Sequence, residues 1–182
     1  MVATKEREPE EEKKGYGKFD GEWKFYHKNG NLEKAERYYM NAIIKMEQIN
    51  HPELIIPQLN LSILRLEKGD FQKLQLELTQ TIPDLEANNK NTLALFARAI
   101  LLVAQINQDD WRYAEENLRQ ITSLLHQTSM VDGDVALLLE KAGNSIFQKH
   151  KTELQRRLYR LAIQQFKGLN RQDKIKALNE KI

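Results

Sequence analysis

The sequence contains no cysteine and few residues that interrupt helices. Among 182 residues there are 0 Cys, 4 Pro and 8 Gly. A chain without thiols forms no disulfide, binds no metal through thiolates and has no cysteine nucleophile. Such a chain is typical of an intracellular protein, so we expect a cytoplasmic location. The scarcity of Pro and Gly favours long helices over a sheet with many turns.

Long apolar runs and recognisable catalytic motifs are also missing. No run of 18 apolar residues occurs, so the sequence predicts no membrane span. The start, MVATKEREPEEEKKG, lacks the apolar core of a signal peptide. The four histidines lie far apart in the sequence, and neither a glycine-rich phosphate loop nor a G-x-S-x-G frame occurs. We therefore expect no enzyme activity, no metal site and no cofactor.

Charge is distributed unevenly along the chain. The formal net charge is +2, but residues 149–182 carry ten Lys or Arg and three Asp or Glu. That segment therefore has a net charge of +7, which leaves −5 for residues 1–148. Residues 1–18 are charged and almost without apolar side chains, so we expect a disordered tail there.

Apolar residues recur at helical spacing along most of the remaining chain. Four segments show one apolar face each, with apolar residues three or four positions apart, and predict amphipathic helices: 32–49, 71–82, 111–125 and 154–166. No convincing alternation of the kind that strands show is present. A further segment, 54–69, is apolar on more than one face. It is either buried on both sides or exposes an apolar strip.

Short breaks between these segments recur at a nearly constant interval. They are Asn29-Gly30-Asn31, Lys68-Gly69-Asp70, Gln108-Asp109-Asp110 and His150. Positions 30, 69, 109 and 150 are 39, 40 and 41 residues apart. Gly or Asn after a helix, followed by Asn or Asp before the next, is typical of a tight helix–helix turn. An interval of this size predicts repeated helical hairpins.

The residues around each break resemble the tetratricopeptide repeat. The positions that carry the resemblance are Gly30, Leu32, Ala35, Tyr39 and Ala42; Gly69, Asp70, Phe71 and Leu78; Asp109, Trp111, Ala114 and Leu118; and Ala142, Gly143, Tyr159 and Ala162. In the second unit Leu74 stands where the family has a small residue, in the third Asp109 replaces the glycine, and the fourth has no turn glycine. The units are also longer than the family's usual length of about 34 residues.

The resemblance implies an all-α fold, a right-handed superhelix of about four antiparallel helix hairpins over residues 19–168. Residues 169–182 would form a C-terminal capping helix that starts at Asn170 as N-cap, with Ile175, Leu178 and Ile182 as a thin apolar stripe; a helix for dimerisation or for a partner is the alternative for this segment. Two other interpretations stay open. One is an irregular helical bundle. The other is a MORN-type β-hairpin at residues 20–33, DGEWKFYHKNGNLE, which also resembles that family's motif.

The tetratricopeptide resemblance implies a protein–protein interaction scaffold that binds a peptide or a helix of a partner in a groove lined by the first helix of each hairpin. The groove-facing candidates are Lys24, Lys28, Leu59, Asn60, Ile63, Leu66, Arg98 and Gln105. As an alternative, a basic patch of Arg156, Arg157, Arg160 and Lys167 could bind an acidic partner or, without aromatic residues interleaved among these cations, less favourably a nucleic acid. A third hypothesis is a regulatory repeat domain of a larger protein.

Overall fold

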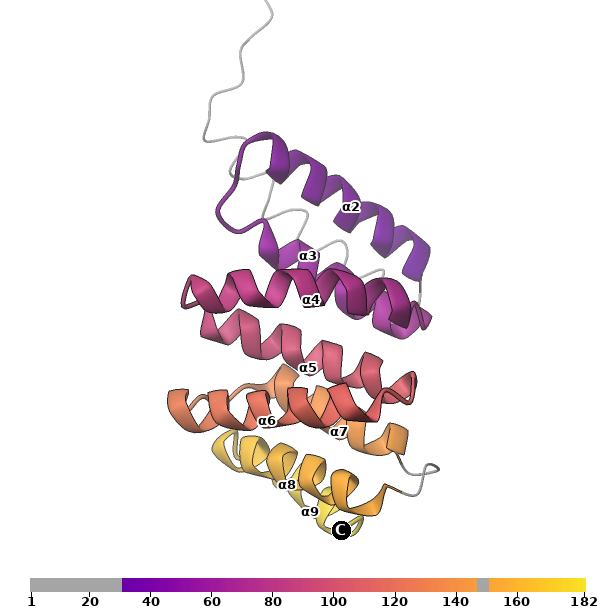
Figure 1. Cartoon of the computed structure of the whole chain (residues 1–182), viewed down its shortest axis with the longest axis vertical. Coiled ribbons are helices and arrows are strands. Elements are labelled where there is room, and N and C mark those ends of the chain that lie inside the picture. Colours follow the sequence, from indigo (N-terminus) through magenta and orange to yellow (C-terminus); the bar gives the residue numbers. More distant parts are fainter. Residues whose placement is uncertain (1–30, 147–150) are drawn as a thin grey trace, which may run out of the picture. The chain divides into compact units, whose positions relative to one another are not determined.

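The computed structural model describes residues 31–146 and 151–182, and across these two ranges the chain is helical without a strand (Figure 1). The helices are α2 (Leu32–Gln48), α3 (Ile55–Lys68), α4 (Phe71–Ala87), α5 (Asn91–Asn107), α6 (Trp111–Thr128), α7 (Gly133–Ile146), α8 (Thr152–Gly168) and α9 (Gln172–Asn179). The prediction of an all-α chain is therefore confirmed for this part of the sequence. Among these helices, none combines the length and the apolarity needed to cross a membrane.

The four predicted amphipathic segments coincide with helices, except that α2 ends at Gln48, one residue before the predicted end, and their predicted faces point inward. For example, Ala114, Leu118 and Ile121 of α6 are fully buried. The predicted disordered tail and the alternative β-hairpin at residues 20–33 fall almost wholly outside the described residues; where the structure begins, at Asn31, the chain enters α2.

The chain divides into two compact units, Met1–Lys68 and Gly69–Ile182. In the first unit, α2 packs against α3. Their core consists of Ala35, Tyr39, Leu61 and Leu64. The buried side chains of α3 lie on more than one side of the helix, as the apolar pattern of segment 54–69 allowed. This outcome favours burial over an exposed apolar strip.

In the second unit, α5 is the most buried element. It packs against α4, α6 and α7, and α7 in turn packs against α8. The side chains from Ala99 to Ile106 are all buried. Since a helix turns through a full circle in 3.6 residues, a run of this length points in every direction around the axis. An apolar helix of this kind must have neighbours on several sides, which explains why α5 lacks the amphipathic pattern of α4 and α6.

Contacts between residues 35 to 40 positions apart align the helices of the second unit in one direction. At the C-terminal ends of α5 and α7, Asn107 Nδ2 lies 3.5 Å from Ser145 Oγ. At the N-terminal ends of α4 and α6, Gln75 Nε2 donates to Asp110 Oδ2 at 3.0 Å. Because equivalent ends meet, α5 and α7 run in the same direction, and so do α4 and α6.

Most of the helices end on a residue in the left-handed conformation, and that residue is usually not glycine. Gly69 after α3 has φ +77°, but Asn89 after α4 has φ +55° and Asp109 after α5 has φ +59°. In both latter turns the N–H of the following residue bonds five residues back, Lys90 to the Leu85 carbonyl at 2.8 Å and Asp110 to the Gln105 carbonyl at 2.9 Å. This is the Schellman arrangement. Asn and Asp adopt the left-handed region at lower cost than other side chains, so Asp109 can replace the expected glycine.

One predicted cap is wrong. Asn170 was expected to cap the N-terminus of the last helix, but it has φ +56° and belongs to the end of α8. The N–H of Arg171 bonds to the Phe166 carbonyl at 3.0 Å, which completes the same type of turn. Arg171 therefore occupies the N-cap position, and α9 begins at Gln172.

The hairpin of α7 and α8 has a close helix contact at Gly143. A Cβ atom at this position would lie 2.4 Å from Cε1 of Tyr159, so only glycine lets the ring pack there. Gln155 Nε2 donates to the Gly143 carbonyl at 3.0 Å, and the Tyr159 hydroxyl donates to Asn144 Oδ1 at 2.9 Å. The contact joins the small residue of a first helix to the aromatic residue of the second helix.

Candidate functional site

The structure places the predicted groove residues in different environments. Leu59, Leu66 and Gln105 are buried, whereas Asn60, Ile63 and Arg98 are partly exposed. Lys24 and Lys28 lie outside the described residues. Four of the set lie on α3 in the first unit, and Arg98 and Gln105 lie on α5 in the second. The three buried side chains serve the packing of the chain in this structure.

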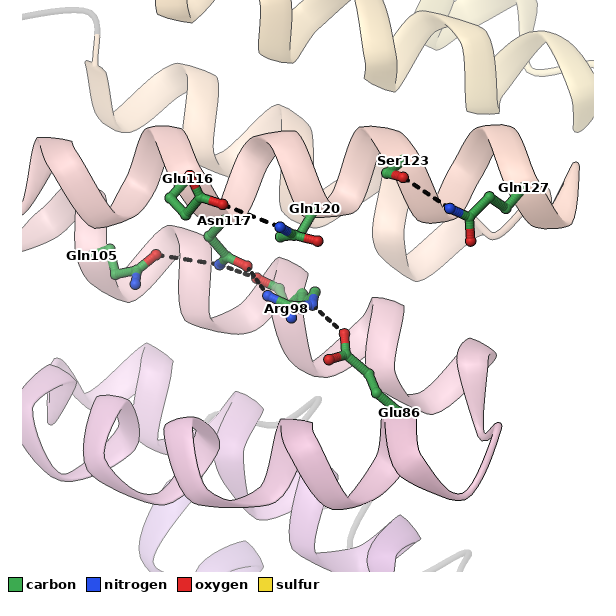
Figure 2. A network of polar contacts seen from close by, with 8 residues as sticks. All are labelled: Glu86, Arg98, Gln105, Glu116, Asn117, Gln120, Ser123 and Gln127. Carbon is green, nitrogen blue, oxygen red and sulfur yellow. Dashed lines mark hydrogen bonds and ion pairs between the residues drawn. The ribbon is translucent and has the colours of Figure 1, made fainter.

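Arg98 and Gln105 meet through a residue that the sequence analysis did not single out, Asn117 of α6 (Figure 2). Arg98 Nη1 donates to Asn117 Oδ1 at 3.0 Å, and Asn117 Nδ2 lies 2.9 Å from the Arg98 carbonyl and 3.2 Å from Gln105 Oε1. Arg98 Nε also pairs with Glu86 Oε1 of α4 at 2.7 Å. The network thus connects α4, α5 and α6 through charged and neutral hydrogen bonds.

Asn117 could have been found from the sequence by its position. It falls on the apolar face of α6 between Ala114 and Leu118, where a polar residue needs a hydrogen-bond partner. The oxygen and the nitrogen of its side-chain amide both form hydrogen bonds, and the residue is buried. Because an unpaired amide in such a place is costly, the network stabilises this packing of α6 on α5, and it occupies two of the five N–H donors of Arg98.

The outer face of α6 carries polar pairs within the helix. Arg119 and Gln120 both contact Glu116. Figure 2 shows Gln120 beside Glu116, and Gln127, whose Nε2 donates to Ser123 Oγ at 3.0 Å. The hydrogen bond from Gln120 and then the neighbouring Arg119 lower the pKa of Glu116 below its usual value. Pairs at this spacing are a common feature of solvated helix faces. This face therefore shows no convergent site.

The exposed side of α7 forms a stripe on a first helix. Asp134, Leu137, Lys141 and Asn144 are exposed, at spacings of three and four residues. Leu137 is 46% exposed and lies among these polar side chains. An exposed leucine between polar neighbours is the kind of residue that anchors a peptide at an interface.

The predicted basic patch lies along the outer side of α8. Arg156, Arg160 and Lys167 are exposed, and Arg157 is partly exposed. Arg156 Nε donates to the Ile182 carbonyl at 3.2 Å. Among the residues that the structure describes, Arg157, Arg160 and Lys167 form no ion pair. The patch is therefore a row of cations with unneutralised charge.

Lys174 of α9 and Lys181, two residues after that helix ends, attach the C-terminal segment to α7 and α8. Lys174 Nζ lies 2.8 Å from Glu140 Oε2 and 5.9 Å from the centre of the Phe166 ring. Lys181 Nζ lies 2.9 Å from Asn144 Oδ1 and 5.7 Å from the centre of the Tyr159 ring. Burial raises the pKa of Tyr159 above its usual value, so its hydroxyl keeps the proton that it donates to Asn144.

Within the described ranges, no three His, Cys, Asp or Glu side chains come together in a way that could hold a metal ion. Comparisons of the chain with protein-family models, with curated proteins and with solved structures found no match. Any functional assignment therefore depends on the geometry of the chain itself.

Proposed function

We propose that the chain is a protein–protein interaction scaffold of tetratricopeptide-like helical hairpins, and that it binds a peptide or a helix of a partner protein. The observation that carries this proposal is the alignment of successive helices in the second unit. First helices α5 and α7 run in one direction, and second helices α4 and α6 do the same. In a stack of this kind, a constant step between hairpins produces a right-handed superhelix with an extended binding surface.

Two further contacts support the same interpretation. Lys151, at the start of α8, lies over the Trp111 ring at the start of α6, with 5.6 Å from Nζ to the ring centre. This contact extends the alignment of second helices to α8. The fit of the Tyr159 ring against Gly143 matches the pairing of a small and an aromatic residue in the family that the sequence resembles.

The surface that we assign to the partner is the exposed stripe of α7 with Leu137 at its centre. In stacked hairpins, the first helix of each hairpin lines the concave side. Among these helices in the described part of the second unit, α7 has a large apolar side chain on its exposed face. Leu137 would insert into the partner, and Lys141 would interact with its polar rim.

Two matched substitutions test this assignment. Leu137→Asp places a charge on the first-helix stripe, and Leu76→Asp places the same charge on α4, a second helix, where Leu76 is 64% exposed. Wild-type and variant proteins are immobilised, and the proteins that each retains from a cell extract are identified. The affinity of each retained protein for the wild type and for the variants is then measured by calorimetry. We expect a partner that wild type and Leu76→Asp retain and that Leu137→Asp loses. Identical retention by all three proteins would contradict the assignment.

A second candidate function uses the cations of α8. Arg157, Arg160 and Lys167 have no ion-pair partner in the described structure, so they are available to an acidic protein or to nucleic-acid phosphates. Phosphate contacts predict that affinity falls steeply as salt increases, whereas an apolar anchor predicts little change. Binding measured at two salt concentrations with Arg160→Glu, and with Arg119→Glu on α6 as control, separates the two candidates.

A further inference from the structure

Helix α9 is held in place by few side chains. It has eight residues, and of these Ile175 and Leu178 are buried. A helix of this length is not stable by itself in water, so its order depends on contacts with α7 and α8. Those contacts are the two apolar side chains and the two lysines, Lys174 and Lys181. An element with so little burial belongs to the part of a fold that opens most easily.

The surface beneath α9 is complementary to a particular pattern. Glu140 and the Phe166 ring form one cation site, and Asn144 and the Tyr159 ring form another. The two lysines that occupy these sites are seven residues apart: Lys174 lies in α9, and Lys181 lies in the turn after the helix ends at Asn179. The buried Ile175 and Leu178 lie between them in the sequence. The surface therefore fits a short helix and the turn that follows it, with the pattern Lys-Ile-x-x-Leu-x-x-Lys.

The position of α9 is also that of a first helix in a further hairpin. Residues 140 and 144 of α7 contact residue 174 of α9 and residue 181, two positions after α9 ends, in the same order, so this segment runs in the same direction as α7. Phe166 and Tyr159 of α8 meet the same two lysines in reverse order, so α8 and α9 are antiparallel. A partner helix could take this position without any change in α7 or α8.

We propose that the face of α7 and α8 defined by Glu140, Asn144, Tyr159 and Phe166 is a binding site for a basic amphipathic helix of a partner protein, and that α9 is its resident occupant, which the partner helix displaces. The occupant follows from charge complementarity: a carboxylate, an amide oxygen and two aromatic faces select two cations seven residues apart, one in the helix and one in the turn after it. This site shares Asn144 with the Leu137 stripe, but the proposal does not depend on the function assigned to that stripe.

A synthetic peptide of residues 170–182 serves as the probe, and the full-length chain is the receptor. In wild type the tethered α9 competes at high effective concentration, so the labelled peptide binds weakly. In the full-length Leu178→Asp variant the resident helix is detached. We expect this variant to bind the peptide at least about tenfold more tightly than wild type, because the competing state is removed. Fluorescence anisotropy measures both affinities.

Peptide variants test the pattern. Lys174→Glu in the peptide should weaken binding to the Leu178→Asp chain by about fivefold or more, since it sets a carboxylate against Glu140. Lys176→Glu in the peptide is the matched control, because Lys176 is exposed and should change affinity by less than about twofold. A receptor that also carries Glu140→Lys should prefer the Lys174→Glu peptide over the wild-type peptide.

A second receptor variant keeps the test valid if Leu178→Asp unfolds more of the chain than α9. If Leu178→Asp has less helix by circular dichroism than the loss of α9 explains, the full-length Lys174→Glu/Lys181→Glu chain replaces it, because neither change enters the core. No gain in peptide affinity in the folded receptor would overturn the proposal and leave α9 as a fixed cap. Equal effects of Lys174→Glu and Lys176→Glu would also overturn it, as would failure of Glu140→Lys to reverse the preference.

Discussion

Helices α5 and α9 lie in the same unit of the chain, but different interactions hold them. In α5, eleven of 17 residues are buried, whereas α9 buries two of eight. Buried apolar area is the main source of stability for α5. For α9, contacts of lysine side chains with a carboxylate, an amide and aromatic rings make up a larger share of the interactions. The comparison teaches that the position in the stack decides the kind of interaction: an interior helix has neighbours on several sides, and α9 has a large polar exposed face.

The largest expected effect comes from equal truncations in the two helices. Leu102 of α5 and Leu178 of α9 are both fully buried. Leu102→Ala should lower the free energy of unfolding by about 3 kcal/mol, because it leaves a cavity in the centre of the unit. Leu178→Ala should cost about 1 kcal/mol or less, because the loss cannot exceed the docking energy of α9. Urea denaturation followed by circular dichroism measures both values.

Equal losses for the two leucines would show that α9 unfolds together with α5 and would remove the distinction between them.

The next effect concerns the closest helix contact. Gly143→Ala would place a methyl group against the Tyr159 ring, so we expect a loss of about 2 kcal/mol in the free energy of unfolding. Gly133→Ala, at the start of α7, is the control, because its Cβ would lie 3.5 Å from Leu169 Cδ1, an ordinary contact. That substitution should be neutral or stabilise the protein by up to about 1 kcal/mol. Thermal unfolding of both variants tests the pair, and a stable Gly143→Ala protein would contradict the contact.

The polar network at α5 predicts a similar or smaller effect. Asn117→Ala removes the hydrogen bond to Gln105 Oε1 and the one from Arg98 Nη1, so the free energy of unfolding should fall by about 2 kcal/mol. Gln120→Ala on the exposed face of the same helix should change stability by less than about 0.5 kcal/mol. Equal stability of the two variants in urea would show that the network contributes nothing to the packing of α6.

The smallest effect is at the start of α9. Arg171 pairs with Asp173 through two hydrogen bonds of 2.9 and 2.8 Å. These hydrogen bonds are the main reason why the pKa of Asp173 is lowered from 3.8 to about 2. A lowered pKa means that the ionised form is favoured in the folded state. The contribution of this pair is therefore complete above about pH 4 and is lost as the pH falls towards 2. A side-chain NMR titration should give the lowered pKa, and Arg171→Gln should return it towards 3.8.

Local patterns predicted the helices because the spacing of apolar residues reflects which face is buried. The faces of α6 and α8 were predicted correctly, and the turns at Gly69 and Asp109 were found from their composition. The role of Asn170 was wrong because Asn is favoured both as an N-cap and in the left-handed turn, and the sequence alone does not decide between them. The partners of Arg98 depend on tertiary contacts between α4, α5 and α6, which no local pattern contains.

Candidate site residues were harder to predict for the same reason. Gln105 was placed in a groove because it lies on a first helix, but α5 is surrounded and Gln105 bonds to Asn117. Leu137 gave no special signal in the sequence, since an exposed leucine and a buried one look alike within an apolar helix. Only the packing of α7 against α5 and α8 shows which of its leucines remains exposed.

The parallel alignment of successive first helices is the central claim, and a disulfide test addresses it directly. The natural chain has no cysteine, so an engineered pair has no competitor. Asn107→Cys with Ser145→Cys joins the C-terminal ends of α5 and α7, and Thr92→Cys with Ser145→Cys would join opposite ends. Mild oxidation followed by mass spectrometry should show an internal disulfide in the first pair and none in the second. A disulfide in the second pair and not in the first would mean that α5 and α7 are antiparallel, and the stacked-hairpin account would be wrong.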